Sequence, residues 1–394
     1  TTGDQKISAT DFDLTATYRV LVIANADLTT GTYKIEKGNT LGDVRDKVYI
    51  DALYSGSGLR DKAYAFVMTS ENDIELNFND PGVKTVDKVG NYTKELYSFT
   101  SIRIERMAAR IDFSTQYSYG AGTEYAAEYK TKDKSDKVYA YPGYVYPVYK
   151  TTDTDGNPTS PDRFVVTAVV PFNLSLINTG FGEYLFKRTD DTTSPYLIDE
   201  TTSNWVIDPQ RASKTGSAHP TYFDFKLTDL ANTLSALDPH GALAGLGNYL
   251  SAESFQSSSA KYDLTVSGSN TADNLIVAYP KENTLLPDSK LYYYATGLAI
   301  EGYYYVNDDA TTTPTRFVYV GYLRHQGEGE SYTIVEPDVL DKNATCKPGL
   351  AMNFGIVRNN IYRVSIHKIN EKGAMELSIK VKKWDPYIHE YIFM

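Results

Sequence analysis

Short segments in which apolar and polar residues alternate recur along the chain, and this pattern predicts a protein made mainly of β-strands. The clearest such strand spans 375–381, where one face is expected to be buried and the other exposed. Its expected inward residues are Met375, Leu377, Ile379 and Val381. A hairpin is predicted around 138–148, where Pro142 and Pro147 suggest the edge of a sheet. Further strands are predicted at 63–68, 163–171, 184–187, 218–227, 261–266, 274–279, 290–300, 303–307, 317–322, 331–335 and 361–369.

Two segments depart from simple alternation. Residues 12–24 begin by alternating and then become apolar on both faces, which predicts a central strand buried on both sides. In residues 101–113 the apolar positions switch from one face to the other midway. A bulge or kink is therefore expected near 105–106, because a uniform strand would expose half of its apolar residues.

The end of the sequence is a third unusual segment. Trp384 breaks the alternation of the preceding strand, and Pro386 lacks the N–H that a strand ladder needs, so that strand is expected to end here. A new strand should follow, because the next residues have high β propensity and both of their faces favour burial. Its residues are Tyr387, Ile388, His389, Glu390, Tyr391, Ile392, Phe393 and Met394. This strand suits a central position in a sheet, either in another molecule or in the chain's own domain.

The chain is long enough for two domains of ordinary size. Residues 188–203 are polar and acidic and contain a proline, as is typical of a linker. The prediction is a pair of β-sandwich domains at 1–190 and 200–394, the second ending in a tail at 385–394. Short helices are expected at 39–48 and 227–237, where apolar residues recur at helical spacing.

Composition restricts the kinds of partner. The net charge of −11 repels phosphate and argues against nucleic acid or an anionic membrane surface as a partner. The sequence has no apolar run long enough to span a membrane and no signal-peptide pattern, so the chain is expected to be already processed. With one cysteine, Cys346, no internal disulfide is expected. The 34 Tyr residues again favour strands.

Motifs for catalysis or metal binding are weak. His389 and Glu390 begin like a zinc motif, but the residue at position 393 is Phe and a strand cannot place such ligands as a helix does. Residues 153–157 have carboxylates at calcium-loop spacing but lack the acidic twelfth ligand, so a solvated turn is the simpler interpretation. No nucleophile elbow is present. We therefore expect no enzyme activity, catalytic residue, metal or cofactor.

Seven segments share a recognisable pattern and order, namely RVLVIAN (19–25), FVMTS (66–70), SIRIERMAARIDF (101–113), VVPFN (169–173), EYLFKR (183–188), RNNIYRVSI (358–366) and SIKVKKW (378–384). In these segments the chain resembles the fimbrillin family, the FimA-like subunits of the type V pilus of Gram-negative gut and oral anaerobes. The resemblance covers most of the chain and is weakest over 200–340. The most specific segments are ERMAARIDF and the pair RNNIYRVSI and VKKW.

The resemblance implies two tandem transthyretin-like β-sandwich domains, export as a lipoprotein, and a fimbrium anchored at the outer membrane that contributes to adhesion. It also implies cleavage after an arginine near the N-terminus, for which Arg19, the first arginine, is the candidate. The groove thus opened would accept the C-terminal strand of the next subunit, with residues 387–394 as donor strand. The partners would be copies of this chain or related pilin subunits, with host protein or glycan as further partners.

A different class of function remains open. A monomeric surface lipoprotein or tip adhesin would bind glycan or host protein through tyrosine-rich segments such as 292–294 and 303–305. Successive residues of a strand point to opposite faces, so ordinary core filling is the simpler interpretation of these tyrosines.

Overall fold

The computed structural model describes part of the chain. The described residues are 13, 15–20, 22–24, 34–40, 66, 68–70, 74–80, 84–89, 92–97, 104–106, 108–118, 124–126, 131–133, 138–140, 143–150, 160–175, 223–224, 261–264, 274–281, 283, 295–309, 311–323, 331–335, 355–369 and 375–384. These residues form mainly β-strands, which confirms the predicted fold class. The helical element among them is a 3₁₀ turn, η10 (Val306–Asp308).

One five-stranded sheet, here called the β22 sheet, contains the two strands with the clearest sequence pattern. Its strand order is β18 (Asn274–Ala278), β8 (Arg110–Ser114), β22 (Asn360–Ile369), β23 (Met375–Lys383) and β21 (Ser331–Val335). Neighbouring strands are antiparallel except β8 and β22, which run parallel. The alternation in 375–381 is confirmed, because all four predicted inward residues are buried.

The second five-stranded sheet, here called the β19 sheet, is antiparallel throughout. It runs in the order β13 (Tyr144–Pro147), β14 (Arg163–Phe172), β19 (Gly297–Tyr305) and β20 (Thr315–Tyr322), and β17 (Tyr262–Asp263) also pairs with β14. Residues of β14 are buried on both faces after Arg163, as its sequence, apolar apart from Thr167, suggests.

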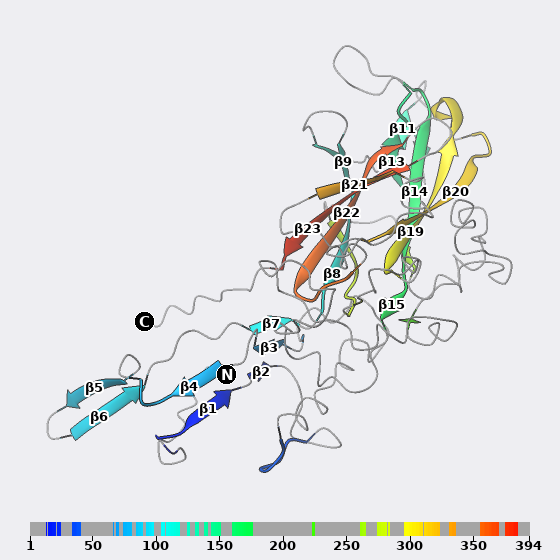
Figure 1. Cartoon of the computed structure of the whole chain (residues 1–394). Coiled ribbons are helices and arrows are strands. Elements are labelled where there is room, and N and C mark those ends of the chain that lie inside the picture. Colours follow the sequence, from blue (N-terminus) through cyan, green and yellow to red (C-terminus); the bar gives the residue numbers. More distant parts are fainter. Residues whose placement is uncertain are drawn as a thin grey trace.

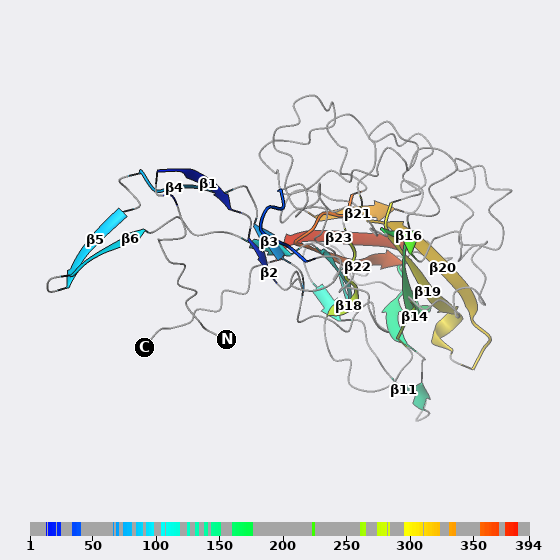
Figure 2. The ribbon, with the colours of Figure 1, turned by 90° about the horizontal axis from the view of Figure 1, so that it is seen from below.

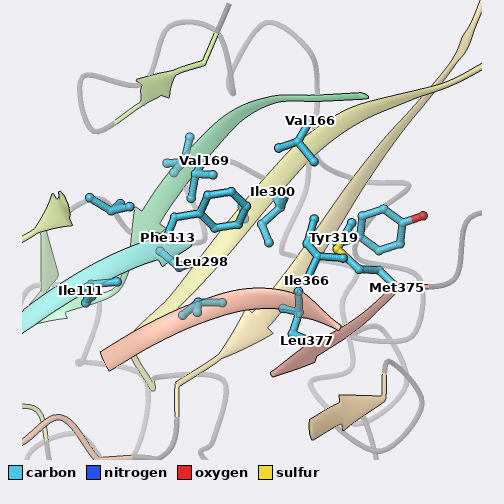
Figure 3. Close-up of a cluster of buried hydrophobic side chains, with 14 of the residues drawn as sticks. Ile111, Phe113, Val166, Val169, Leu298, Ile300, Tyr319, Ile366, Met375 and Leu377 are labelled. Atoms are coloured by element: carbon cyan, nitrogen blue, oxygen red, sulfur yellow. The ribbon is translucent and has the colours of Figure 1, made fainter. Parts of the chain in front are cut away.

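The two sheets pack face to face around a single hydrophobic core (Figure 3). Figure 3 shows Phe113 of β8 and Ile366 of β22 turned toward Val169 and Ile300 of the β19 sheet. All four side chains are buried. The two sheets therefore form one β-sandwich.

The N-terminal strands form smaller sheets. They are β1 (Thr17–Val20) with β4 (Ile74–Asn77), β2 (Ile23–Ala24) with β3 (Met68–Ser70) and β7 (Ile104–Arg106), and β5 (Lys84–Val89) with β6 (Tyr92–Tyr97). Figures 1 and 2 show the β2–β3–β7 sheet next to the sandwich, with the β1–β4 and β5–β6 pairs farther away. The remaining pairs are β9 (Gln116–Ser118) with β10 (Glu124–Ala126), β11 (Thr131–Asp133) with β12 (Val138–Ala140), and β15 (Leu174–Ser175) with β16 (Phe223–Asp224).

The strand pairings cross the predicted domain boundary between 1–190 and 200–394. Strand β8 pairs with β18 and β22, and β14 pairs with β19, so strands from both ranges share each sheet of the sandwich. The separation that the described strands do show lies near residue 107, between the N-terminal sheets and the sandwich. An acidic segment can have the composition of a linker and still connect strands of one domain, because composition does not encode sheet order. The transthyretin-like topology stays a prediction.

The two segments that depart from simple alternation, 12–24 and 101–113, also depart from their predicted structures. In 101–113 the bulge or kink predicted near 105–106 is wrong, because residues 104–106 pair with β3 without a register shift. The change of face instead separates β7 from β8, which belong to different sheets. The prediction that the second half of 12–24 is a central strand buried on both faces is wrong. The segment forms β1 and β2, their described apolar residues are half-buried, and β2 is the edge strand of its three-stranded sheet.

Other predictions have mixed outcomes. The prediction of a hairpin within 138–148 is wrong, because β12 pairs with β11 while β13 pairs with β14. The edge position suggested by the prolines of this segment is confirmed for β13 within the described sheet. Segments 184–187, 188–203, 227–237 and 385–394, and most of 39–48, lie outside the described residues.

Candidate functional site: the base of the C-terminal tail

Trp384 is the last described residue and directly precedes the predicted tail. It follows β23 and continues beside the start of β22, because its N–H donates to the carbonyl oxygen of Asn359 at 2.7 Å. Although Trp384 breaks the alternation of β23, its side chain is only 8% exposed. The parity break therefore marks a residue that leaves the sheet pattern in order to pack elsewhere.

The Trp384 ring packs against two other aromatic rings. It stacks on Tyr279 with ring centroids 5.8 Å apart at an interplanar angle of 10°, and meets Phe66 edge-on at 5.0 Å. Phe66 and Tyr279 contact each other at 4.8 Å. Both are buried, so the rings exclude water from one another. Aromatic pairs of this geometry are worth about 0.5–1.5 kcal/mol each beyond the area they bury.

Arg106, the last residue of β7, also contacts the Trp384 ring. Its guanidinium carbon lies 4.6 Å from the centroid of the Trp384 ring, which is cation–π geometry. Its Nη1 also donates to the carbonyl oxygen of Trp384 at 3.3 Å and to Oδ1 of Asn359 at 3.4 Å. One guanidinium therefore holds both the ring and the main chain of the residue that begins the tail.

Asn359 completes the arrangement through its backbone. Its φ of 57° lies in the left-handed region, which asparagine tolerates better than most residues. In this conformation its N–H donates to the carbonyl oxygen of Ala108 at 2.8 Å, while its own carbonyl accepts from Trp384. The side chain of Asn360 braces the same turn by donating to the carbonyl oxygen of Arg358 at 2.8 Å.

Together, Phe66, Arg106, Tyr279, Asn359 and Trp384 form what we call the tail-base cluster. Its members come from four parts of the chain that are distant in sequence, namely the segments before β3, at the end of β7, after β18, and on either side of the β22–β23 pair. The cluster is made of three aromatic rings, a guanidinium and an asparagine. Its chemistry is suited to anchoring a segment of chain.

The structure places the predicted site residues as follows. The donor strand, 387–394, lies outside the described residues. Arg19 lies in β1, where its register partner is Glu75 of β4. The described contacts do not bring Arg19 into the tail-base cluster. Within the described part of the chain, no group of three or more His, Cys, Asp or Glu residues is arranged to hold a metal, and no helix could cross a membrane.

The sequence did not single out Phe66, Arg106, Tyr279 or Asn359 as site residues. A signal was nevertheless present for three of them, because Phe66, Arg106 and Asn359 lie in the segments FVMTS, ERMAARIDF and RNNIYRVSI. Those segments converge on the tryptophan of VKKW. Tyr279 had no such signal.

Comparison with known proteins adds little to this description. No model of a known protein family matches the chain, and no curated protein sequence matches it. The chain is similar to a solved structure of a candidate cell adhesion protein from Bacteroides eggerthii, at 12% identity and a TM-score of 0.32, over 93% of this chain and 77% of that chain. A likeness at this level establishes neither a family nor a function.

Proposed function

We propose that the chain is a structural subunit of a cell-surface fimbria that polymerises by donating residues 387–394 to a neighbouring subunit. One observation carries the proposal: Trp384 is fixed by the tail-base cluster two residues before Pro386. The strand that follows favours burial on both faces. An anchored base followed by such a strand is what β-augmentation of another molecule requires.

The energetics support a donor role for the tail. About six large apolar side chains at roughly 1.5–3 kcal/mol each give on the order of 10 kcal/mol of gross burial. Ordering the backbone costs roughly 1–2 kcal/mol per residue, which is a comparable total. Fixing one end of the donor lowers the part of that cost paid on binding, because a preorganised segment loses less freedom.

The acceptor is proposed to form at the β1–β4 pair. Cleavage after Arg19 would separate most of β1 from the chain and leave β4 without the partner that it has in this structure. An isolated two-stranded pair is marginally stable, so the cut strand can leave. The backbone of β4 would then offer hydrogen-bonding groups to an incoming strand.

The wider assignments follow from the same proposal. A subunit of this kind is exported, resides in a fimbrium anchored at the outer membrane, and contributes to adhesion through copies of itself or related subunits. The tyrosine-based adhesin receives less support from the β19 strand. Tyr304 and Tyr305 are 8% and 6% exposed and therefore offer a ligand little surface.

Polymerisation after processing tests the proposal. Subunits would be treated with an arginine-specific protease and examined for ladders of oligomers by gel electrophoresis and electron microscopy. Intact chains should form ladders, and chains lacking 387–394 should stay monomeric. R19K keeps the charge but removes the cleavage site, so it should also stay monomeric. Ladders of equal length from intact and shortened chains would refute strand donation.

A further inference from the structure

The outer face of the β22 sheet, away from the sandwich core, carries a concentration of positive charge. On β22 and β23 the core side chains alternate with residues that point to this outer face. Arg363 of β22 and Arg110 of β8 are half-buried there, Lys380 of β23 is exposed, and Lys382 is half-buried. We call Arg110, Arg363, Lys380 and Lys382 the basic surface.

Strand register brings these cations together. Arg363 lies directly opposite Lys380, and Ile361 lies between Arg110 on one side and Lys382 on the other. The carboxylate at the same level of the sheet is Asp112, whose side chain is fully buried. Arg110 holds it through Nε at 2.6 Å and Nη2 at 3.0 Å, whereas Nη2 of Arg363 is 3.9 Å away. Among the described side chains at this level of the sheet, one buried acid thus compensates part of the charge of four cations.

This arrangement works against stability. Like charges directly opposite each other in an antiparallel pair are destabilising. Arg363 and Lys380 are such a pair, in a chain whose net charge is −11 and in which acids outnumber bases. A cluster of cations on such a chain is complementary to the rest of the chain's own surface, and therefore to another copy of it.

The position of the basic surface connects it to the tail. Lys380 and Lys382 precede Trp384 on the same strand, at the end of β23 that carries the tail-base cluster, whereas Glu376 occupies the opposite end. A neighbouring subunit that holds residues 387–394 must come close to this end of the sheet. Only a few residues separate Lys382 from the predicted donor strand.

We propose that the basic surface docks the acidic surface of a neighbouring copy of this chain and steers it toward the tail. This inference rests on the proposed function, because it concerns the subunit that accepts residues 387–394. Complementary charge raises association rates by about 10- to 1,000-fold at low ionic strength. The effect falls as salt shortens the Debye length, from about 30 Å at 0.01 M to about 3 Å at 1 M.

The test compares two full-length double variants with the same change in charge. K380E/K382E reverses the charge of the two lysines of the basic surface, and K34E/K37E reverses two exposed lysines elsewhere. After protease treatment, light scattering gives the initial rate of polymer growth. At about 0.01 M salt we expect K380E/K382E to grow at least about tenfold more slowly than wild type and than K34E/K37E. At about 1 M salt the three rates should converge.

A milder pair keeps the test valid if K380E/K382E does not fold. K380Q/K382Q removes the charge without reversing it and should give an intermediate rate at low salt. Circular dichroism would show that each variant keeps its strand content. Equal low-salt growth rates for wild type, K380Q/K382Q and K34E/K37E would overturn the proposal.

Two other outcomes are also decisive. If no variant polymerises, strand donation fails, but static light scattering of the same samples still measures attraction between copies. Loss of low-salt attraction in K380E/K382E alone would support the basic surface, and unchanged attraction would overturn it. If K380E/K382E loses retention on a heparin column while its self-association is unchanged, the surface binds anionic polysaccharide and the proposed partner is wrong.

Discussion

Replacing Trp384 with alanine tests the tail-base cluster most severely. The substitution removes a ring that is 8% exposed, stacked on Tyr279 and in edge contact with Phe66, and it removes the cation–π partner of Arg106. Buried tryptophan-to-alanine changes cost about 3–5 kcal/mol. The aromatic and cation–π contacts account for about 1–3 kcal/mol of this. We expect W384A to lower the free energy of unfolding by about 3–5 kcal/mol.

The assay is urea unfolding followed by far-ultraviolet circular dichroism. Fluorescence is less suitable, because the substitution removes one of 2 tryptophans. W384F is the matched control, since it keeps a ring between Tyr279 and Phe66 and should recover more than half of the loss. An unchanged dependence of the free energy on urea would show that the unfolding reaction is the same in each variant.

A double-mutant cycle isolates the contribution of Arg106. R106A alone should cost about 1–2 kcal/mol, but in the W384A background it should cost much less, because its cation–π partner is already absent. A loss of unfolding free energy below about 1 kcal/mol for W384A would refute the reasoning, because removing a ring from a buried cluster should cost more than that. Additivity of R106A and W384A would show that the guanidinium does not act on the ring.

Three further substitutions test other parts of the account. N359A should lower the free energy of unfolding by about 1–2 kcal/mol, because alanine is strained at a φ of 57°. N359G loses the side chain without this backbone strain and should cost less. Thermal unfolding of the two variants makes the comparison. G302A should destabilise the sandwich by about 1–3 kcal/mol in urea unfolding, because an added Cβ would overlap the Phe164 ring and lie 2.9 Å from the Val165 carbonyl oxygen. Burial raises the pKa of Asp112 above 3.8 despite the opposing effects of Arg110 and Arg363. Protonation of this carboxyl group therefore favours the folded state. As the pH rises from about 4, the wild type should lose stability relative to D112N in unfolding titrations.

The sequence predicted local features better than long-range pairing. The alternation of 375–381 depends on neighbouring residues and is confirmed. The change of face in 101–113 is also a local feature, but it separates strands of two sheets and is not the predicted bulge within one strand. The domain division relied on a polar segment, whereas β8 pairs with a strand some 250 residues later. No local pattern records that pairing, because the parallel contact of β8 with β22 depends on the whole sheet.

The tail-base cluster shows the same limit at the level of a site. The broken alternation at Trp384 could be read from the sequence, and it correctly marked the end of β23. The partners of Trp384 could not be read, because Phe66, Arg106 and Tyr279 reach it from three separate segments. The charge of the basic surface is likewise divided among β8, β22 and β23, so no basic run appears in the sequence.

The most direct test of strand donation uses the tail as a separate molecule. A fluorescent peptide of residues 385–394 would be mixed with protease-treated subunits that lack 387–394, and binding followed by fluorescence anisotropy. The account predicts saturable binding with slow release, little binding to untreated subunits, and no binding of a peptide with acidic residues in place of Ile388 and Ile392. Equal binding of that acidic peptide, or no binding of the native peptide to treated subunits, would contradict it.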